Sequence, residues 1–401
     1  MPEGQEKNKI SFDCVMACIY FVCLPLTVIT TAYGSVLRLV TLPTVAILSV
    51  RLLLGKSRLV FNYVHMIYAV YVLYSVFQLS YFRTEISTIV TRDMFTGLLT
   101  LILISVRVYN PKEKEFIDNT WVVVGVICLV AAFTSSEVVS ESEGRAVIKI
   151  FGSEEDQNQF CSYFIMPMII CIDRIIKKRK FKTFYMIMLL LIFYSVLKTG
   201  SRGGLVGLIF GALAFVVIGV KSVKGKIAVC LISVFVFFFA VKVVFPLLPE
   251  SVTERFSVAA VVEDKASGRF EIWKYLINYT MEKPSRIIFG SGIMSTYPIL
   301  FDAPDKTFRN GVAHNTPIQV FSDQGIIGLM LFLALAIACL ARAARVDKIY
   351  ACAFFSMLAF SMSLTFYVFK PCLNLMIMSA LSFKGSLPED ILNKKERTDL
   401  I

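Results

Sequence analysis

Long runs of apolar residues alternate with short polar segments along the whole chain, and 57% of the 401 residues are hydrophobic. A helix needs about 20 mostly apolar residues to cross the hydrocarbon core of a bilayer, and only helices or closed barrels satisfy their backbone hydrogen bonds there. The runs are too long and too uniform for the alternating strands of a barrel. The pattern predicts an all-α, polytopic membrane protein with about twelve transmembrane helices. These helices are expected at residues 12–32, 36–54, 60–82, 86–107, 119–136, 160–177, 183–199, 203–220, 226–247, 316–341, 349–369 and 371–384.

One connection is much longer than the others, and it divides the chain. We expect about nine transmembrane helices in residues 1–247, a large extracytoplasmic loop at 248–315, and about three more helices with a cytoplasmic tail at 316–401. A loop of that length predicts a function or a small folded unit. Within it, the stretch RFEIWKYLINYTM (269–281) indicates an amphipathic helix that lies along the membrane surface or caps a cavity. Its apolar face is expected to consist of Phe270, Trp273, Ile277 and Met281.

The distribution of charge predicts how these helices are oriented. The chain carries 41 lysines and arginines against 29 aspartates and glutamates, a net charge of +12. The cations gather in alternate loops, which the positive-inside rule places in the cytoplasm together with both termini. Asp156, Arg202 and the 248–315 loop then face outward. Because this pattern accounts for the basic balance and no basic soluble domain is present, nucleic acid is not expected as a partner.

The ten cysteines lie mostly inside apolar runs, and no C-x-x-C pair occurs. We interpret them as small core residues, and we expect neither a metal nor another cofactor. The polar N-terminal segment lacks a small-residue cleavage site after the first apolar run. This favours a retained first helix over a removed signal peptide.

Three polar motifs are expected on the outer side, where polar groups at a helix end are costly unless they face water or a ligand. They are TGSRGG (199–204), Ser267-Gly268-Arg269 at the start of the amphipathic helix, and His314-Asn315 before the helix at 316–341. Each has a structural alternative: Arg202 could reach lipid phosphates, Arg269 could be solvated, and His314 could be half-buried at the interface.

Two further polar residues have simpler interpretations. Asp156, in DQNQF (156–160) before a predicted helix, is suited to capping that helix, with a substrate contact as the other possibility. His65, inside the apolar run FNYVHMIYAV, is interpreted as structural. These two positions therefore add little to the chemistry expected of the three motifs.

Taken together, two arginines and a histidine on one face of a membrane suit a phosphorylated lipid whose head group lies outside. A guanidinium fork matches phosphate oxygens, and each charge-assisted hydrogen bond contributes about 1.5–3 kcal/mol. If the phosphate is a leaving group, the same arginines stabilise the charge it gains. A histidine nearby could take the proton of an attacking hydroxyl, and such a step would need no metal.

The ordered motifs resemble those of the bacterial O-antigen ligases and the related polysaccharide polymerases. The resemblance is carried by TGSRGGLVGL (199–208), by SGRFEIW and FGSG (267–273 and 289–292), and by HNTPIQVFSDQGIIGL (314–329), with DQNQF as a further similarity. It covers the C-terminal half of the chain, and the N-terminal half is similar only in its succession of apolar helices.

The resemblance implies a metal-independent, inverting glycosyltransferase of the bacterial plasma (inner) membrane, surrounded by membrane lipid and acting in surface polysaccharide assembly. It would take a glycan from an undecaprenyl-diphosphate carrier and pass it to a sugar hydroxyl. By the same resemblance His314 is the catalytic residue and Arg202 and Arg269 hold the diphosphate. Ser201, Asn315 and Asp156 complete the expected substrate site.

The acceptor stays open between two possibilities. A polymerase would use another carrier-linked glycan, in O-antigen or capsule assembly, whereas a ligase would use the lipid A core. We favour the polymerase, because no feature of the sequence points to binding the heavily phosphorylated core. The alternative outside enzymology is a twelve-span transporter, which the missing two-half repeat and the outer placement of the polar motifs disfavour.

Overall fold

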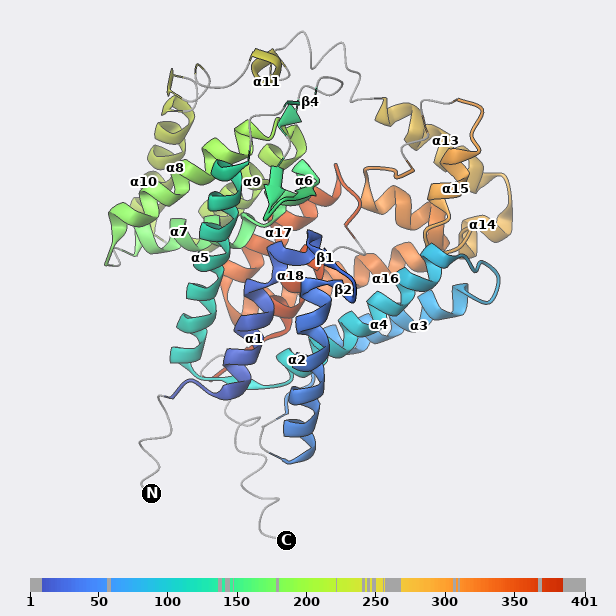
Figure 1. Ribbon diagram of the computed structural model, residues 1–401, viewed down its shortest axis with the longest axis horizontal. Helices are drawn as coiled ribbons and strands as arrows, with labels where there is room; N and C mark the ends of the chain where they lie inside the picture. The colour runs from blue at the N-terminus through green and yellow to red at the C-terminus, as the bar shows by residue number, and fades with distance from the viewer. Residues whose placement is uncertain are drawn as a thin grey trace.

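The computed structural model describes residues 9–55, 59–135, 139–140, 145–146, 148–177, 180–220, 222–239, 242–243, 246, 250–254, 256, 268–305, 308, 311–366 and 370–384. These residues are mostly helical, and the strands among them form short two-stranded pairs (Figure 1). The helices are α1 (Phe12–Val22), α2 (Val36–Leu53), α3 (Tyr63–Gln78), α4 (Glu85–Ser105), α5 (Pro111–Thr134), α6 (Gln157–Ser162), α7 (Ile165–Ile176), α8 (Lys182–Lys198), α9 (Arg202–Ala214), α10 (Val223–Phe239), α11 (Glu250–Glu254), α13 (Arg269–Met281), α14 (Pro284–Phe289), α15 (Thr296–Phe301), α16 (Thr316–Val346), α17 (Lys348–Ser361) and α18 (Lys370–Ala380), with a 3₁₀ helix at Leu24–Val28 and a π-helical turn at Phe215–Gly219. The strand pairs are β1 (Thr30–Thr31) with β2 (Gly34–Ser35), β4 (Val139–Ser140) with β5 (Arg145–Ala146) and β6 (Ile148–Ile150) with β7 (Ser153–Glu155), all antiparallel, and β3 (Val108–Tyr109) with β8 (Ser382–Phe383), which is parallel.

Within the described residues, six helical segments are long and apolar enough to cross a membrane. They are Val36–Leu53, Glu85–Ser105, Pro111–Thr134, Gln157–Ile176, Arg202–Gly219 and Thr316–Val346. The apolar helices Phe12–Val22 and Lys348–Ser361 are shorter, and so are α3, with 16 residues, and α8, with 17. An all-α membrane protein is thus confirmed, whereas the full number of about twelve spans stays a prediction.

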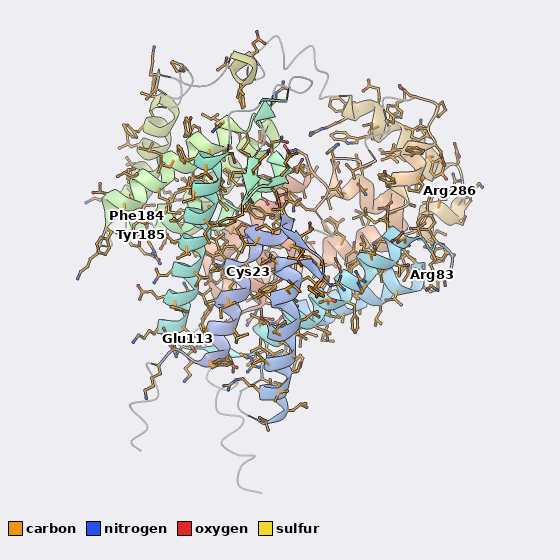
Figure 2. All side chains as sticks on the ribbon, viewed as in Figure 1. Cys23, Arg83, Glu113, Phe184, Tyr185 and Arg286 are labelled. Carbon is orange, nitrogen blue, oxygen red and sulfur yellow. The ribbon has the colours of Figure 1, made fainter. Side chains whose placement is uncertain are left out.

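Both ends of the described chain meet at one end of the helix bundle. The Asn110 side-chain amide donates to the carbonyl of Lys9 at 2.9 Å, and the Lys384 N–H donates to the carbonyl of Tyr109 at 2.8 Å. Glu113, which closes a capping box with Asn110 at the start of α5, is labelled at this end in Figure 2. The two ends of the chain therefore lie on one side of the bundle, as two cytoplasmic termini would require.

Helix α3 connects this end of the bundle to the opposite one. Asn62 caps its first turn, and its N–H donates to His65 Nδ1 at 3.0 Å, while His65 Nε2 lies 2.6 Å from Ser105 Oγ. The interpretation of His65 as structural is therefore confirmed by its contacts. The far end of α3 carries Gln78, whose amide donates to the carbonyl of Phe289 at 2.9 Å. Because Phe289 belongs to the segment that also holds α13, that segment lies at the end opposite the termini.

The amphipathic helix forms with the predicted bounds, Arg269–Met281, but it packs on the protein with a different stripe. Its buried residues are Ile272, Leu276 and Thr280. Of the four residues of the predicted face, Phe270, Ile277 and Met281 are exposed and turned outward, whereas Trp273 is half-buried and contacts the protein. Ser267, which precedes the helix in the sequence motif, lies outside the described residues.

All ten cysteines are free thiols, and most are buried, including Cys14, Cys128 and Cys339. Their interpretation as core residues is confirmed at those positions. Cys230 is the exception: it is exposed on α10, which lies at the edge of the bundle in Figure 1.

Candidate functional site

Three sequence motifs that are far apart along the chain meet at one short turn, residues 362–366, which directly follows α17. Arg269 Nη1 donates to the carbonyl of Ser363 at 3.1 Å, and Asn315 Nδ2 donates to the carbonyl of Met362 at 3.1 Å. Gly203, next to Arg202, lies so close that a Cβ on it would be 2.5 Å from Ser363 Oγ. The 362–366 turn thus contacts the motifs of Arg202, Arg269 and His314.

The same turn is fixed to the first residue of α16. Thr316 Oγ1 donates to the carbonyl of Leu364 at 2.7 Å and accepts from the Phe366 N–H at 2.8 Å. The Thr316 hydroxyl therefore acts both as a donor and as an acceptor. Thr316 is fully buried. This double contact holds the 362–366 turn against the beginning of the helix that follows His314.

The sequence prediction of a continuous span over 349–369 is wrong at its C-terminal end, because α17 ends at Ser361. The hydroxyls of Ser361 and Ser363 donate back to the carbonyls of Leu358, at 2.6 Å, and Phe360, at 3.2 Å. Serine side chains that bond to nearby carbonyls compete with helical backbone bonds and favour turns. The run is apolar enough to resemble a membrane helix, so hydropathy alone does not reveal the break.

His314 has a backbone conformation that is unusual for its residue type. Its φ is 50°, in the left-handed region, which costs a non-glycine residue about 1–3 kcal/mol. The next residue, Asn315, caps α16 with its side-chain oxygen, which accepts from the Ile318 N–H at 3.0 Å. The half-buried His314 side chain therefore sits at a sharp corner between an extended segment and a helix N-terminus.

Arg202 is the first residue of α9, directly after a buried polar corner. Ser201 caps the helix: its hydroxyl accepts from the Gly204 N–H at 2.9 Å and lies 2.6 Å from Asn158 Oδ1, to which it donates. Ser201 and Asn158 are both buried. The structure thus gives Ser201 two partners within the protein, and Asn158, which belongs to the DQNQF motif, positions the corner that precedes Arg202.

The glycines of α9 allow the helix to approach its neighbours closely. A Cβ on Gly207 would lie 1.9 Å from Phe360 Cδ2, and one on Gly204 would lie 2.7 Å from the Cβ of Cys161. No larger residue fits these positions without movement of the packed helix. Gly207 therefore lets α9 lie against α17, the helix that ends in the 362–366 turn, and Gly204 lets it lie against α6.

Asp156 is exposed, and its carboxylate caps α6 by accepting from the Gln159 N–H at 2.8 Å, as the capping interpretation predicts. The neighbouring Glu155 was not singled out by the sequence. Burial raises the pKa of its carboxyl group to about 7, although the Tyr163 hydroxyl, which donates to Oε2 at 2.9 Å, acts in the opposite direction. Glu155 is thus an acid that changes charge near neutral pH, close in sequence to the Asn158–Ser201 corner.

Two glycine-containing motifs, FGSG (289–292) and SDQG (322–325), are hydrogen-bonded to each other. The N–H groups of Ser291 and Gly292 donate to the carbonyls of Ser322, at 3.0 Å, and Asp323, at 2.7 Å. Gly325 interrupts α16 with φ 66° and ψ −167°, and a Cβ on it would lie 2.4 Å from the Ile288 carbonyl oxygen. FGSG and SDQG therefore form one structural unit, which explains why the sequence carries both.

Arg286, another arginine of this segment, contacts residues at the end of α13. Its Nη1 donates to the carbonyl of Tyr279 at 2.9 Å and to Glu282 Oε2 at 3.1 Å, and the guanidinium lies 3.8 Å from the centre of the Tyr279 ring. Figure 2 shows it at the outer edge of the molecule. Arg286 is thus a structural arginine, in contrast to Arg269, whose Nη1 contacts the shared turn.

Within the described part of the chain, no group of three or more histidine, cysteine, aspartate or glutamate side chains is arranged to hold a metal ion. The groups that the motifs offer are guanidinium donors for an anion and an imidazole for a proton. Such a set could bind a phosphate ester and remove a proton from a hydroxyl.

Comparison with known proteins finds a match to a family model over part of the chain. Residues 187–333 match the family model described as O-antigen ligase, a region that includes Arg202, Arg269 and His314. No curated protein matches the chain. The resemblance predicted from the motifs is confirmed, and the match supports membership of the O-antigen ligase family. Together with the apolar helices, it indicates an integral inner-membrane protein with an enzymatic, glycosyltransferase-like role in polysaccharide assembly.

Proposed function

We propose that the protein transfers a glycan from an undecaprenyl-diphosphate carrier to a sugar hydroxyl at the outer face of the inner membrane. The observation that supports this most directly is the 362–366 turn, which contacts Gly203, Arg269 and Asn315. Through these contacts, Arg202 and Arg269 are brought toward the segment that carries His314. These contacts support the proposal because a carrier diphosphate with an outward head group requires two cations and an imidazole near one another.

In the proposed reaction, Arg202 and Arg269 bind the diphosphate of the carrier. The acceptor hydroxyl attacks the anomeric carbon from the face opposite the diphosphate, and a new C–O bond forms as the bond to the diphosphate oxygen breaks. The electron pair leaves with the diphosphate, where the arginines stabilise the charge. His314 takes the hydroxyl proton, a step that typically contributes about 10²–10⁴ in rate. The configuration at the anomeric carbon is inverted, and no metal takes part.

For the acceptor we favour a second carrier-linked glycan, so that the enzyme elongates an O-antigen or capsule chain. Residues 248–315 carry as many acidic as basic side chains, which is a poor match for the phosphorylated lipid A core. The exposed face of α13, with Phe270 and Ile277, is placed at the membrane surface in this proposal. Substrate contacts by Ser201, Asn315 and Asp156 stay predictions, as does the cytoplasmic location of both termini.

The proposed site is tested with the variants Arg202→Ala, Arg269→Ala and His314→Ala. Each is expected to lower glycan transfer by about 10²-fold or more while folded protein is still made. Arg269→Lys should also be poor, since lysine lacks the planar fork. The matched control is Arg286→Ala, which removes an arginine of the same segment that Tyr279 and Glu282 already occupy. Full activity in any two of the three alanine variants would refute the assignment.

Reconstitution in vesicles decides the acceptor. Chain growth from a lipid-linked repeat unit alone is expected, and it would establish the polymerase. Product that appears only after lipid A core is added would establish the ligase instead. Movement of saccharide across vesicles without any change in the lipid-linked glycan would favour a transporter over both.

A further inference from the structure

Ala313, the residue that precedes His314, is bound at both of its backbone polar groups. The Ala313 N–H donates to Gln319 Oε1 at 3.0 Å, and the Ala313 carbonyl accepts from Trp273 Nε1 at 2.7 Å. Ala313 is fully buried. A backbone unit held by two long side chains from two different helices has little freedom to rotate.

This restraint acts next to His314, whose backbone conformation is strained. His314 adopts φ 50°, and such a conformation in a non-glycine residue persists only when the surrounding structure holds it. On its other side, Asn315 is fixed by its cap on α16 and by its bond to the Met362 carbonyl at 3.1 Å. Both neighbours of His314 are therefore anchored, and the strained residue lies between them.

Gln319 is itself held by two further contacts. Its Oε1 also accepts from the Thr365 hydroxyl at 2.8 Å, and its Nε2 lies 3.4 Å from Asp323 Oδ2, to which it donates. The side chain is fully buried. Gln319 thus joins the loop before His314 to the 362–366 turn and to the polar half of α16, and its rotamer is determined by groups on both sides.

Trp273 connects the same loop to the helix that carries Arg269. It lies four residues after Arg269 on α13, one helical turn away, so its indole fixes that helix against the His314 loop. A shift of α13 would move Arg269 and break the bond to Ala313 together. The indole N–H therefore contributes to the relative position of the arginine and the histidine, together with the packing of Ile272 and Leu276.

We propose that Trp273 and Gln319 are positioning residues that hold His314 in its left-handed conformation and in register with Arg269. They do so by binding the carbonyl and the N–H of Ala313, and neither touches the substrate. The proposal rests on the proposed function, in which His314 removes the acceptor proton. Misplacement of a reacting group by about 1 Å can cost roughly 10²-fold in rate without loss of substrate binding.

The test measures kcat and KM for the lipid-linked donor in reconstituted Trp273→Phe and Gln319→Leu proteins. Phenylalanine keeps an aromatic ring but lacks the N–H, and leucine keeps the approximate volume of glutamine without its amide. Both variants should lower kcat by about 10- to 100-fold per folded enzyme, with KM changed by less than about threefold. Folded protein is quantified by size-exclusion chromatography in detergent, so that reduced yield is not counted as reduced kcat.

Two matched controls separate positioning from general packing. Trp121→Phe removes the other tryptophan N–H, which contacts Met378 Sδ at 3.3 Å in the bundle core. Gln324→Leu removes a buried amide of α16 whose side-chain nitrogen and oxygen have no hydrogen-bond partner among the described residues. Both controls are expected to keep kcat near the wild-type value, since neither contacts the Ala313 peptide.

The outcomes distinguish this proposal from the proposed function. If His314→Ala is inactive while Trp273→Phe and Gln319→Leu keep the wild-type kcat, the positioning role is overturned and the catalytic assignment stands. A raised KM with unchanged kcat would overturn it in favour of donor binding. Substantial glycan transfer by His314→Ala would overturn the catalytic role proposed for His314, on which the positioning role depends. If Gln319→Leu does not fold, the kcat of Trp273→Phe alone tests the proposal, because phenylalanine keeps an aromatic ring at this position of α13.

Discussion

The two halves of α16, before and after Gly325, are stabilised in opposite ways. The buried residues of the first half are mostly polar: Thr316, Gln319, Val320, Ser322, Asp323 and Gln324. Those beyond the glycine are apolar or small: Gly328, Phe332, Leu335, Ala336, Ala338, Cys339 and Ala343. The first half is held by hydrogen bonds to loops from distant parts of the sequence, and the second by packing among apolar helices.

The difference shows how a membrane helix can support a polar site. At Gly325 the helix is interrupted, and the carbonyls of Asp323 and Gln324 accept from the Gly292 N–H at 2.7 Å and the Tyr74 hydroxyl at 2.9 Å. Backbone groups released by such a break must find other partners, because lipid supplies none. The broken helix thus anchors the surrounding segments, while its second half stays in the apolar core.

The largest loss of folded protein is expected from Gly325→Ala, which changes the junction between the two halves of α16. Its φ of 66° and ψ of −167° lie in a region essentially restricted to glycine, at a cost of about 1–3 kcal/mol for alanine. The new Cβ would also lie 2.4 Å from the Ile288 carbonyl oxygen, and overpacking adds typically 1–3 kcal/mol. We expect little folded protein by size-exclusion chromatography in detergent.

Gly55→Ala is the control for that variant. Gly55 has the same φ of 66°, but a Cβ there meets nothing within 4 Å. Gly55→Ala therefore has the positive φ without the close packing, and its loss of folded protein should be smaller. Equal yields of the two variants would mean that the close packing at Gly325 does not matter.

A smaller effect is expected from Asp323→Asn, which keeps the shape of the polar half but changes its hydrogen bonds. The buried Oδ1 accepts from the Thr296 N–H at 2.7 Å and the Thr296 hydroxyl at 2.6 Å, and Oδ2 accepts from the Met294 N–H at 3.2 Å. An amide turns an NH₂ group toward at least one of these donors. We expect a loss of about 1–3 kcal/mol, measured as a lower midpoint of thermal unfolding in detergent. The exposed Asp302→Asn serves as control, and an unchanged midpoint for Asp323→Asn would show that the carboxylate is not the anchor of α15.

The contrast between the halves also marks what the sequence could predict. Apolar runs predicted an all-α membrane protein, the ordered motifs predicted the resemblance that the family match supports, and helical spacing predicted the bounds of α13. The sequence did not indicate which stripe of α13 faces the protein, since Ile272 and Leu276 are no more apolar than Phe270 and Ile277. Periodicity detects a face but does not tell protein from lipid.

The 362–366 turn could not be recognised for a related reason. Arg269 and Asn315 bind it through the carbonyls of Ser363 and Met362, which are backbone groups and leave no residue signature. Gln319 and Asp323 did carry a signal, because polar residues inside a membrane helix are costly unless they have partners. Those partners belong to distant segments, so their identity required the fold.

The smallest effect is expected from Tyr81→Phe, which probes how α3 supports the polar half. The carbonyl of Phe289 accepts from Gln78 at 2.9 Å and Tyr81 at 2.9 Å, and the Tyr74 hydroxyl, whose one proton is closer to the Gln324 carbonyl at 2.9 Å, lies 3.2 Å away. Removal of the Tyr81 hydroxyl leaves the carbonyl with the Gln78 amide and the shared Tyr74 hydroxyl, so it stays satisfied. Tyr81→Phe alone should therefore cost less than about 1 kcal/mol, comparable to the exposed control Tyr33→Phe, by thermal unfolding in detergent.

Gln78→Leu combined with Tyr81→Phe should cost more than the sum of the single variants, because only the pair leaves the carbonyl with one weak donor. Strict additivity would show that Gln78 and Tyr81 contribute independent bonds and no shared support for the broken helix.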